Sequence, residues 1–250
     1  MKPDRKQLKR DARLAMRDHK PSVYLVALVF LLLIWVLDTL SFKLNHPGQS
    51  MMDIYRSYMD QQAYVWSLFE TKDFQGFFRD YYASAAHTST GFVAGLMDLA
   101  ISIMNIMLGV GFTFFCLNVS RRAAAGFGNL LDAFGIFFKV LWLHILMAIF
   151  IFLWSLLLVI PGIIASYRYS QAVYILLDDP SKGALQCISE SKALMRGHKW
   201  QLFVLQLSFI GWAILSIIPF VGVYTEPYFR TTYANFYRAL KEHQGTQPEW

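Results

Sequence analysis

A few ionisable side chains lie inside stretches of this sequence that are otherwise apolar. Asp98, Arg168 and Arg230 are the clearest cases, and Glu226 precedes Arg230 by one helical turn. A charged side chain is costly in hydrocarbon unless it faces a partner or water, so such residues mark a binding site or a buried ion pair. A helix rises about 1.5 Å per residue. If each stretch is a helix, we predict that Asp98, Arg168 and Arg230 lie at a similar depth, about 10 Å from the outer membrane surface.

Polar neighbours extend this group to seven residues, which we call the polar layer. The layer could line a cavity, open to the outer side, that binds the anionic part of an amphipathic molecule. It could instead be a network of buried ion pairs that fixes how the helices pack. The sequence leaves both interpretations open. The polar layer consists of Asp98, Asn105, Tyr167, Arg168, Tyr169, Glu226 and Arg230.

No pattern in the sequence is typical of an enzyme or a metal site. It lacks a Walker-type phosphate-binding loop, a zinc-binding His-Glu-x-x-His motif and a nucleophile elbow. Its two cysteines, Cys116 and Cys187, do not have the spacing of metal ligands and predict no disulfide framework. We therefore expect no catalytic residue, no metal and no cofactor.

The elements that must position the polar layer are helices long enough to cross a membrane. Hydrophobic residues make up 56% of the 250 residues and charged residues 16%, and a span needs about 20 predominantly apolar residues. We predict an all-α fold, a polytopic transmembrane helical bundle that forms a single membrane domain over residues 1–250. The six spans are predicted at 23–40, 92–117, 140–160, 163–177, 202–218 and 224–240, with a tight turn at Pro161-Gly162 between the third and the fourth.

The segments between the spans have features of their own. Residues 1–20 and 181–199 are predicted to be amphipathic helices along the cytoplasmic interface, with basic side chains toward the headgroups. Residues 41–90 form an outer loop rich in aromatic residues, predicted to be partly helical and to rest on the membrane or to cap the bundle as a lid. The apolar face of the second amphipathic helix is predicted to hold Ala184, Leu185, Ile188, Leu194 and Met195.

Basic residues are distributed unevenly along the chain, and an excess of them normally stays in the cytoplasm. They cluster in 2–20, 121–139, 182–199 and 238–241, and are sparse in 41–90. We therefore predict a multi-pass protein of the cytoplasmic membrane with both termini in the cytoplasm. Anionic lipid accounts for the net charge of +6. The expected partners are membrane lipid and possible further copies of the chain or another membrane protein, with no nucleic acid.

A weak internal repeat agrees with this layout. Met16-Arg17-Asp18-His19-Lys20 before the first span resembles Met195-Arg196-Gly197-His198-Lys199 before the fifth, and 126–138 before the third could be a degenerate copy. Parallel repeats are a known way of building membrane bundles. The alternative is that basic residues commonly precede any span that leaves the cytoplasm.

Several motifs of the chain form a set that is found together in a known family. They are Ile160-Pro161-Gly162-Ile163-Ile164, Asp178-Asp179-Pro180, Gly197-His198-Lys199-Trp200, Phe209-Ile210-Gly211-Trp212 and Phe236-Tyr237. Together they resemble a bacterial family of integral membrane proteins known as domain of unknown function 975. The resemblance covers most of the chain, is most specific from Ile160 to Trp212 and does not extend to the outer loop. It implies a six-helix membrane protein, similar to the membrane domain of some glycerophosphodiester phosphodiesterases, and brings no established activity, cofactor or catalytic residue.

Two classes of function fit these observations. The first is a membrane-embedded module that binds or translocates a lipid, a peptide or another amphipathic solute. The second is a structural or accessory membrane protein that scaffolds partners and has no substrate path. A water-connected cavity that contains Asp98, Arg168 and Arg230 would favour the first class, and a dry, fully paired cluster would favour the second.

Overall fold

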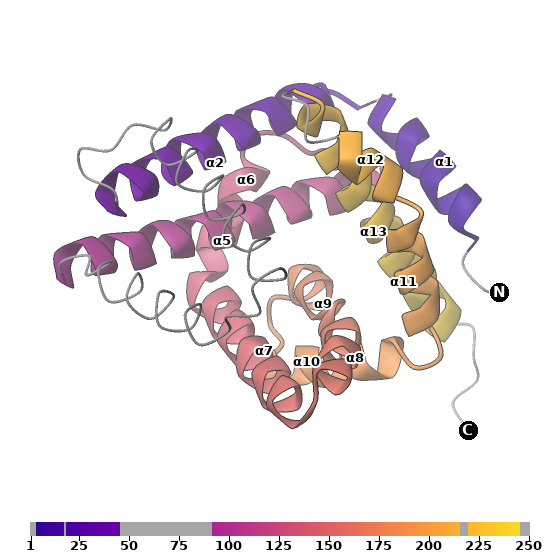
Figure 1. Cartoon of the computed structure of the whole chain (residues 1–250). Coiled ribbons are helices and arrows are strands. Elements are labelled where there is room, and N and C mark those ends of the chain that lie inside the picture. Colours follow the sequence, from indigo (N-terminus) through magenta and orange to yellow (C-terminus); the bar gives the residue numbers. More distant parts are fainter. Residues whose placement is uncertain (1–3, 18, 46–91, 216–219, 246–250) are drawn as a thin grey trace, which may run out of the picture. The chain divides into compact units, whose positions relative to one another are not determined.

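The structure is a computed structural model of the chain, and it describes residues 4–17, 19–45, 92–215 and 220–245. The described residues form helices, and no strand occurs among them (Figure 1). The chain divides into two compact units, which are described separately: unit 1 is Met1–Ile34 with Asn105–Trp250, and unit 2 is Trp35–Met104. Most of the predicted outer loop lies outside the described residues, so its helices stay a prediction.

Three described stretches are long and apolar enough to cross a membrane. Each coincides with one of the first three predicted spans, which are therefore confirmed as helices of sufficient length. The stretches are Val23–Leu44 in α2 (Val23–Asn45), Gly95–Ser120 in α5 (Phe92–Ser120), and Asn129–Leu157, which combines α6 (Asn129–Asp132), the 3-10 helix η1 (Ala133–Ile136) and α7 (Phe137–Leu157).

The other described helices are shorter or less apolar, and all belong to unit 1. Among the described residues, none of these helices combines the length and the apolar composition of a candidate span, so six spans are not shown. The helices are α1 (Arg5–Arg17), α8 (Val159–Tyr169), α9 (Ala172–Asp178), α10 (Ala184–Leu194), α11 (Lys199–Leu207), α12 (Ile210–Leu215) and α13 (Gly222–Gly245).

The turn after α7 comes earlier than predicted. Leu158 is extended, with φ −165° and ψ 148°, and α8 begins at the next residue. Pro161 therefore lies in the first turn of α8, where a proline costs no hydrogen bond because the first N–H groups of a helix have no partner in it. Gly162 allows a close approach of α7, since a Cβ there would lie 2.0 Å from Ser155 Oγ. The predicted turn at Pro161-Gly162 is wrong in position.

The fourth predicted span is two helices instead of one. α8 and α9 are separated by a break at Ser170 and Gln171, and the side chain of Ser191 in α10 bridges this break. Ser191 Oγ donates to the carbonyl oxygen of Arg168 at 2.8 Å and accepts from the backbone N–H of Gln171 at 3.2 Å. Ser191 is fully buried. A neighbouring helix thus satisfies backbone groups that the break would leave without partners.

The fifth and sixth predicted spans also differ from their helices. The fifth is divided into α11 and α12 by Ser208 and Phe209, and residues 216–219 lie outside the described part. The sixth lies within α13, a longer helix that contains Pro227. These breaks do not interrupt the apolar pattern of the sequence, so the pattern alone does not reveal them.

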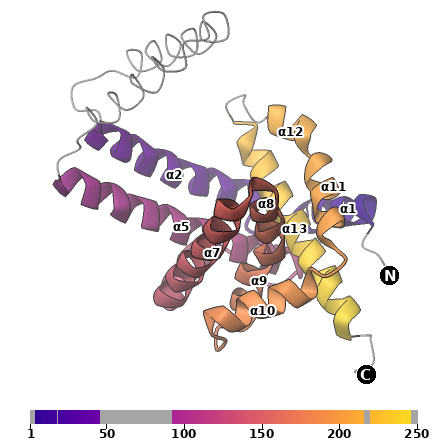
Figure 2. The same ribbon diagram turned by 60° about the horizontal axis from the view of Figure 1, so that its bottom comes forward.

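α1 has the amphipathic pattern that the sequence predicts, and protein covers its apolar face. Leu8, Ala12, Ala15 and Met16 are buried at helical spacing, and α1 packs along α13. Asn235 of α13 donates from Nδ2 to the carbonyl oxygen of Leu8 at 3.1 Å. Figure 2 shows α1 beside α13 and α11. Its position along a membrane interface stays a prediction.

α10 buries a face that differs from the predicted one. Ile188, Leu194 and Met195 are buried as expected, whereas Leu185 is 61% exposed. Cys187 and Ser191 are buried instead. The buried face is rotated because α10 packs against α9 and α7. On this face the Ser191 side chain can form its hydrogen bonds to Arg168 and Gln171 at the break between α8 and α9.

The second half of α5 and the middle of α13 supply much of the core of unit 1. Phe112 and Phe115 of α5 are fully buried, as are Phe236 and Tyr237 of α13. Gly111 is sterically required, because a Cβ there would lie 2.1 Å from the carbonyl oxygen of Leu130 in α6. α5 and α13 therefore both contribute buried aromatic side chains to the core of unit 1.

Candidate functional site

Arg230 of α13 is fixed by three hydrogen bonds. Its Nε donates to Glu226 Oε1 at 2.7 Å, one turn away on the same helix. Its Nη1 donates to the carbonyl oxygen of Gly109 at 2.6 Å and to Thr113 Oγ1 at 2.7 Å, both in α5. The Thr113 hydroxyl in turn donates to the Gly109 carbonyl oxygen at 2.8 Å. Arg230 therefore joins α13 to α5.

Two phenylalanine rings complete the surroundings of this guanidinium. Its Cζ lies 5.5 Å from the centre of the Phe30 ring and 5.4 Å from that of Phe112, and the two rings stack on each other at 4.3 Å. Such cation–π contacts stabilise a charged group that has lost part of its water. The side chain of Arg230 remains 26% exposed and that of Glu226 33%, and no described residue accepts a hydrogen bond from Arg230 Nη2.

The three polar-layer residues of α8 lie in different surroundings. Tyr167 donates its hydroxyl to Gln206 Oε1 of α11 at 2.5 Å. Tyr169 is buried, and Lys192 Nζ of α10 lies 5.6 Å from the centre of its ring. Arg168 is half-buried, and within the described part of the chain its guanidinium has no hydrogen-bond acceptor.

Asp98 and Asn105 complete the polar layer. In unit 2, Asp98 accepts a hydrogen bond from the Ser41 hydroxyl. Asn105 is half-buried in α5, at the start of the second segment of unit 1. Because Asp98 belongs to unit 2 and both arginines to unit 1, a meeting of Asp98 with Arg168 or Arg230 stays a prediction. The structure does bring together Glu226 and Arg230.

A second polar constellation surrounds Asp178, at the end of α9. Its carboxylate is only 7% exposed and accepts hydrogen bonds from the Arg121 guanidinium, from Tyr237 Oη at 2.7 Å and from Lys241 Nζ at 2.5 Å. Arg121 follows α5, and the other two donors belong to α13. We call these four residues the Asp178 cluster. One buried carboxylate thus ties together the ends of α5, α9 and α13.

This cluster is not among the sites predicted from the sequence. The distribution of charge places Arg121 and Lys241 on one side of the membrane, and Asp178 follows directly after the fourth predicted span. The available signal was an acidic residue at the end of one predicted span, on the same side as basic residues at the ends of two others. In the structure, burial lowers the pKa of Arg121 from its usual value, and an arginine still remains charged at neutral pH.

A comparison with known protein families gives a match over part of the chain. Residues 155–244 match the family described as protein of unknown function (DUF975). The resemblance seen in the sequence is confirmed for these residues, which contain Asp178, Glu226 and Arg230. No curated protein and no solved structure matches the chain. The similarity to the membrane domain of glycerophosphodiester phosphodiesterases stays a prediction.

Proposed function

We propose that this chain is a multi-pass protein of the cytoplasmic membrane whose helical bundle binds a lipid, a peptide or another amphipathic solute. In this proposal six spans cross the membrane and both termini are cytoplasmic. The surface of α7 supports a membrane position, because Phe152 is 65% exposed, Leu156 74% and Leu157 72%. Contiguous exposed apolar side chains of this kind are normally covered by lipid or by another protein.

The breaks in α8–α9 and α11–α12 are compatible with six spans. In a membrane, a helix can be interrupted only where protein groups satisfy the freed backbone. Ser191 does this at the break between α8 and α9, where it bonds both Arg168 and Gln171. Each pair of short helices therefore serves as one interrupted span in this proposal.

The observation that carries the binding function is the way in which Arg230 is held. Three hydrogen bonds and two aromatic rings fix its guanidinium, and its Nη2 has no acceptor among the described residues. A donor that is fixed in advance loses little conformational entropy when it binds a carboxylate or a phosphate. Arg230 is therefore the residue that we assign to the anionic part of the solute.

A scaffold without a substrate path is the second candidate, and a specific contact favours it. Glu226 already pairs with Arg230 at 2.7 Å, and the bonds to Gly109 and Thr113 join two helices. In this second candidate, Arg230 fixes the register of α5 and α13 and binds no solute. The two candidates differ in what the negative charge of Glu226 does.

The substitution Glu226→Gln separates the two candidates, because it keeps a side-chain acceptor for Arg230 and removes the negative charge. If Arg230 binds an anionic solute, purified Glu226→Gln should retain more anionic lipid in native mass spectrometry and Arg230→Gln should retain less. If the pair only supports the fold, both variants should melt at lower temperature with retained lipid unchanged. Glu242→Gln is the control, because Glu242 forms the other i,i+4 pair of this helix, with Arg238, and is 72% exposed.

A further inference from the structure

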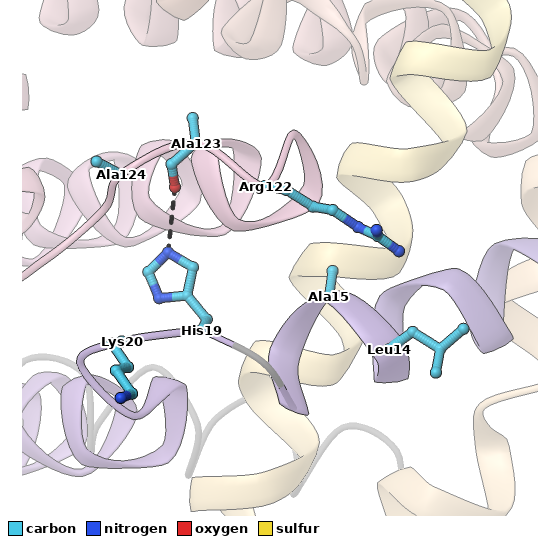
Figure 3. Close-up of a pocket in the computed structure, with 7 residues that line it drawn as sticks. All are labelled: Leu14, Ala15, His19, Lys20, Arg122, Ala123 and Ala124. Atoms are coloured by element: carbon cyan, nitrogen blue, oxygen red, sulfur yellow. Dashed lines mark hydrogen bonds between the residues drawn. The ribbon is translucent and has the colours of Figure 1, made fainter.

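A cavity of about 290 Å³ lies where the chain enters α2 and leaves α5 (Figure 3). Leu14 and Ala15 of α1, the adjoining His19 and Lys20, and residues 122–124 line it. All of these residues belong to unit 1. None of them is part of the polar layer, so this cavity is distinct from the surroundings of Arg230.

Basic side chains line the cavity, and no acidic side chain is among the described residues that line it. His19, Lys20 and Arg122 line it, and the structure gives the side chains of Lys20 and Arg122 no hydrogen-bond acceptor or ion pair among the described residues. Lys20 and Arg122 are thus two exposed cations beside one cavity, and an anion between them is attracted to both. The cavity is therefore suited to a small anionic group.

The backbone of Arg122 is unfavourable for an arginine. Its φ of 55° lies in the left-handed region. Arg122 N–H bonds to the Val119 carbonyl oxygen at 2.9 Å and Ala123 N–H to the Asn118 carbonyl oxygen at 3.0 Å. These two bonds are the Schellman pattern that ends a helix, and its left-handed position is usually glycine. Elsewhere among the described residues a positive φ occurs at Gly197, with φ 75°, and at Phe220, with φ 72°. Keeping an arginine at the end of α5 points to a use for its side chain.

His19 fixes one wall of the cavity. Its Nδ1 lies 3.3 Å from the carbonyl oxygen of Pro21 and its Nε2 lies 3.2 Å from that of Ala123, and the ring packs edge-on against Phe115. Figure 3 shows the ring directed at Ala123 and the Arg122 side chain extending toward α1. These contacts hold the imidazole ring against the chain at the edge of the cavity.

We infer that this cavity binds a phosphate group, supplied either by an anionic lipid headgroup or by free phosphate. Arginine and lysine are the usual partners of phosphate oxygens, arginine through its planar fork and lysine as a point charge. Lys20 lies shortly before α2 and Arg122 shortly after α5, and α2 and α5 both contain candidate spans. In a membrane, the cavity would thus lie where two spans end, at the level of the lipid phosphates. The inference does not depend on a role of Arg230 in binding.

The test compares the full-length parent with Arg122→Gly, Lys20→Gln and the control Lys43→Gln. Lys43 is exposed, lies outside the lining and outside the basic segments predicted at the cytoplasmic interface, and its substitution removes the same charge as Lys20→Gln. Native mass spectrometry would measure binding of phosphatidylglycerol and phosphatidylcholine, and thermal melts would measure the effect of inorganic phosphate against chloride at equal ionic strength. Arg122→Gly removes the charge and supplies the residue that the backbone favours, so the fold should be as stable as the parent or more so.

We expect the parent to prefer phosphatidylglycerol to phosphatidylcholine, and Arg122→Gly and Lys20→Gln each to bind phosphatidylglycerol about fivefold more weakly, as for the loss of one basic residue near an anionic headgroup. Lys43→Gln should bind like the parent. If free phosphate is the ligand, phosphate should raise the melting temperature of the parent and not of Arg122→Gly, with lipid binding equal in all variants. Parent-like binding of both ligands by Arg122→Gly and Lys20→Gln would overturn the inference, as would a parent that neither prefers phosphatidylglycerol nor is stabilised by phosphate.

Discussion

Arg230 in α13 donates a hydrogen bond from Nη1 to the carbonyl oxygen of Gly109 in α5, across 2.6 Å. The same carbonyl oxygen also accepts from Thr113 Oγ1, and Thr113 Oγ1 accepts from Arg230. Three polar groups thus form a closed triangle between two helices. An arginine placed in this way sets the register of α13 on α5, whether or not it also binds a solute.

Removing the threonine hydroxyl tests the energetic weight of this triangle. Thr113→Val keeps the shape of the side chain but takes away an acceptor of the Arg230 charge, which should cost about 1.5–3 kcal/mol of stability, as for other bonds to charged groups. Thermal or denaturant unfolding in detergent measures the loss. Ser166→Ala is the control, because the exposed Ser166 hydroxyl only donates to the Ile163 carbonyl oxygen of its own helix. Equal stability of Thr113→Val and the parent would contradict the register role.

Two glycines of α5 provide a matched pair for the helix packing. A Cβ at Gly111 would lie 2.1 Å from the Leu130 carbonyl oxygen, whereas a Cβ at Gly109 would meet nothing within 4 Å. Gly111→Ala should therefore destabilise the protein, because backbone of α6 must move. Gly109→Ala should be neutral or stabilising by about 0.5–1 kcal/mol, the usual preference for alanine inside a helix. The opposite order of their melting temperatures would show that α6 does not lie against α5 as described.

Removing the negative charge of Asp178 should lower the stability of the protein. Asp178→Asn keeps the size of the side chain but removes the charge that Arg121 and Lys241 share. Because Arg121 stays 33% and Lys241 62% exposed, we expect a cost of about 1.5–3 kcal/mol, as for other hydrogen bonds to charged groups. Asp179→Asn is the control, since the side chain of the neighbouring Asp179 bonds only locally, to Ser181. Unfolding of both variants at the same temperature would refute a structural role for this cluster.

Ser191 accounts for the break between α8 and α9, and its removal tests that account. Ser191→Ala would leave the Arg168 carbonyl and the Gln171 N–H without this partner, at a cost of about 1–3 kcal/mol for a buried unsatisfied group. Ser189 is exposed on the same helix, so Ser189→Ala should have little effect. Hydrogen exchange at Gln171 should be faster in Ser191→Ala than in the parent. Unchanged exchange and stability would mean that the break does not depend on Ser191.

The sequence predicts the features of this structure that depend on residues close together along the chain, and it does not predict those that depend on residues far apart along the chain. Long apolar runs predict the candidate spans in α2, α5 and α7, because span length and composition are local properties. The break between α8 and α9 depends on Ser191, which lies in another helix, so no local pattern indicates it. Likewise, Pro161 suggests a turn, but Leu158 makes it, since proline is also favourable in the first turn of a helix.

In the candidate site, too, the local contact could be predicted and the contacts between remote residues could not. The spacing of Glu226 and Arg230 by one helical turn indicates that they can pair, and the structure contains this pair. The bonds from Arg230 to Gly109 and Thr113 join residues that are remote in sequence, and glycine and threonine in an apolar run give no sign of them. The Asp178 cluster was missed for the same reason, because its four residues come from three different parts of the chain.

The most direct test of the central claim measures on which side of the membrane Ser181 lies. Six spans with a cytoplasmic N-terminus place Ser181 in the cytoplasm. If only the three long apolar stretches cross, Ser181 lies outside together with everything after α7. In intact cells, a single-cysteine variant Ser181→Cys, with Cys116 and Cys187 replaced by alanine, would be treated with a membrane-impermeant maleimide. Gln61→Cys, between the first two predicted spans, is the positive control. The account predicts labelling of Gln61→Cys and no labelling of Ser181→Cys until the cells are permeabilised, and labelling of Ser181→Cys in intact cells would contradict it.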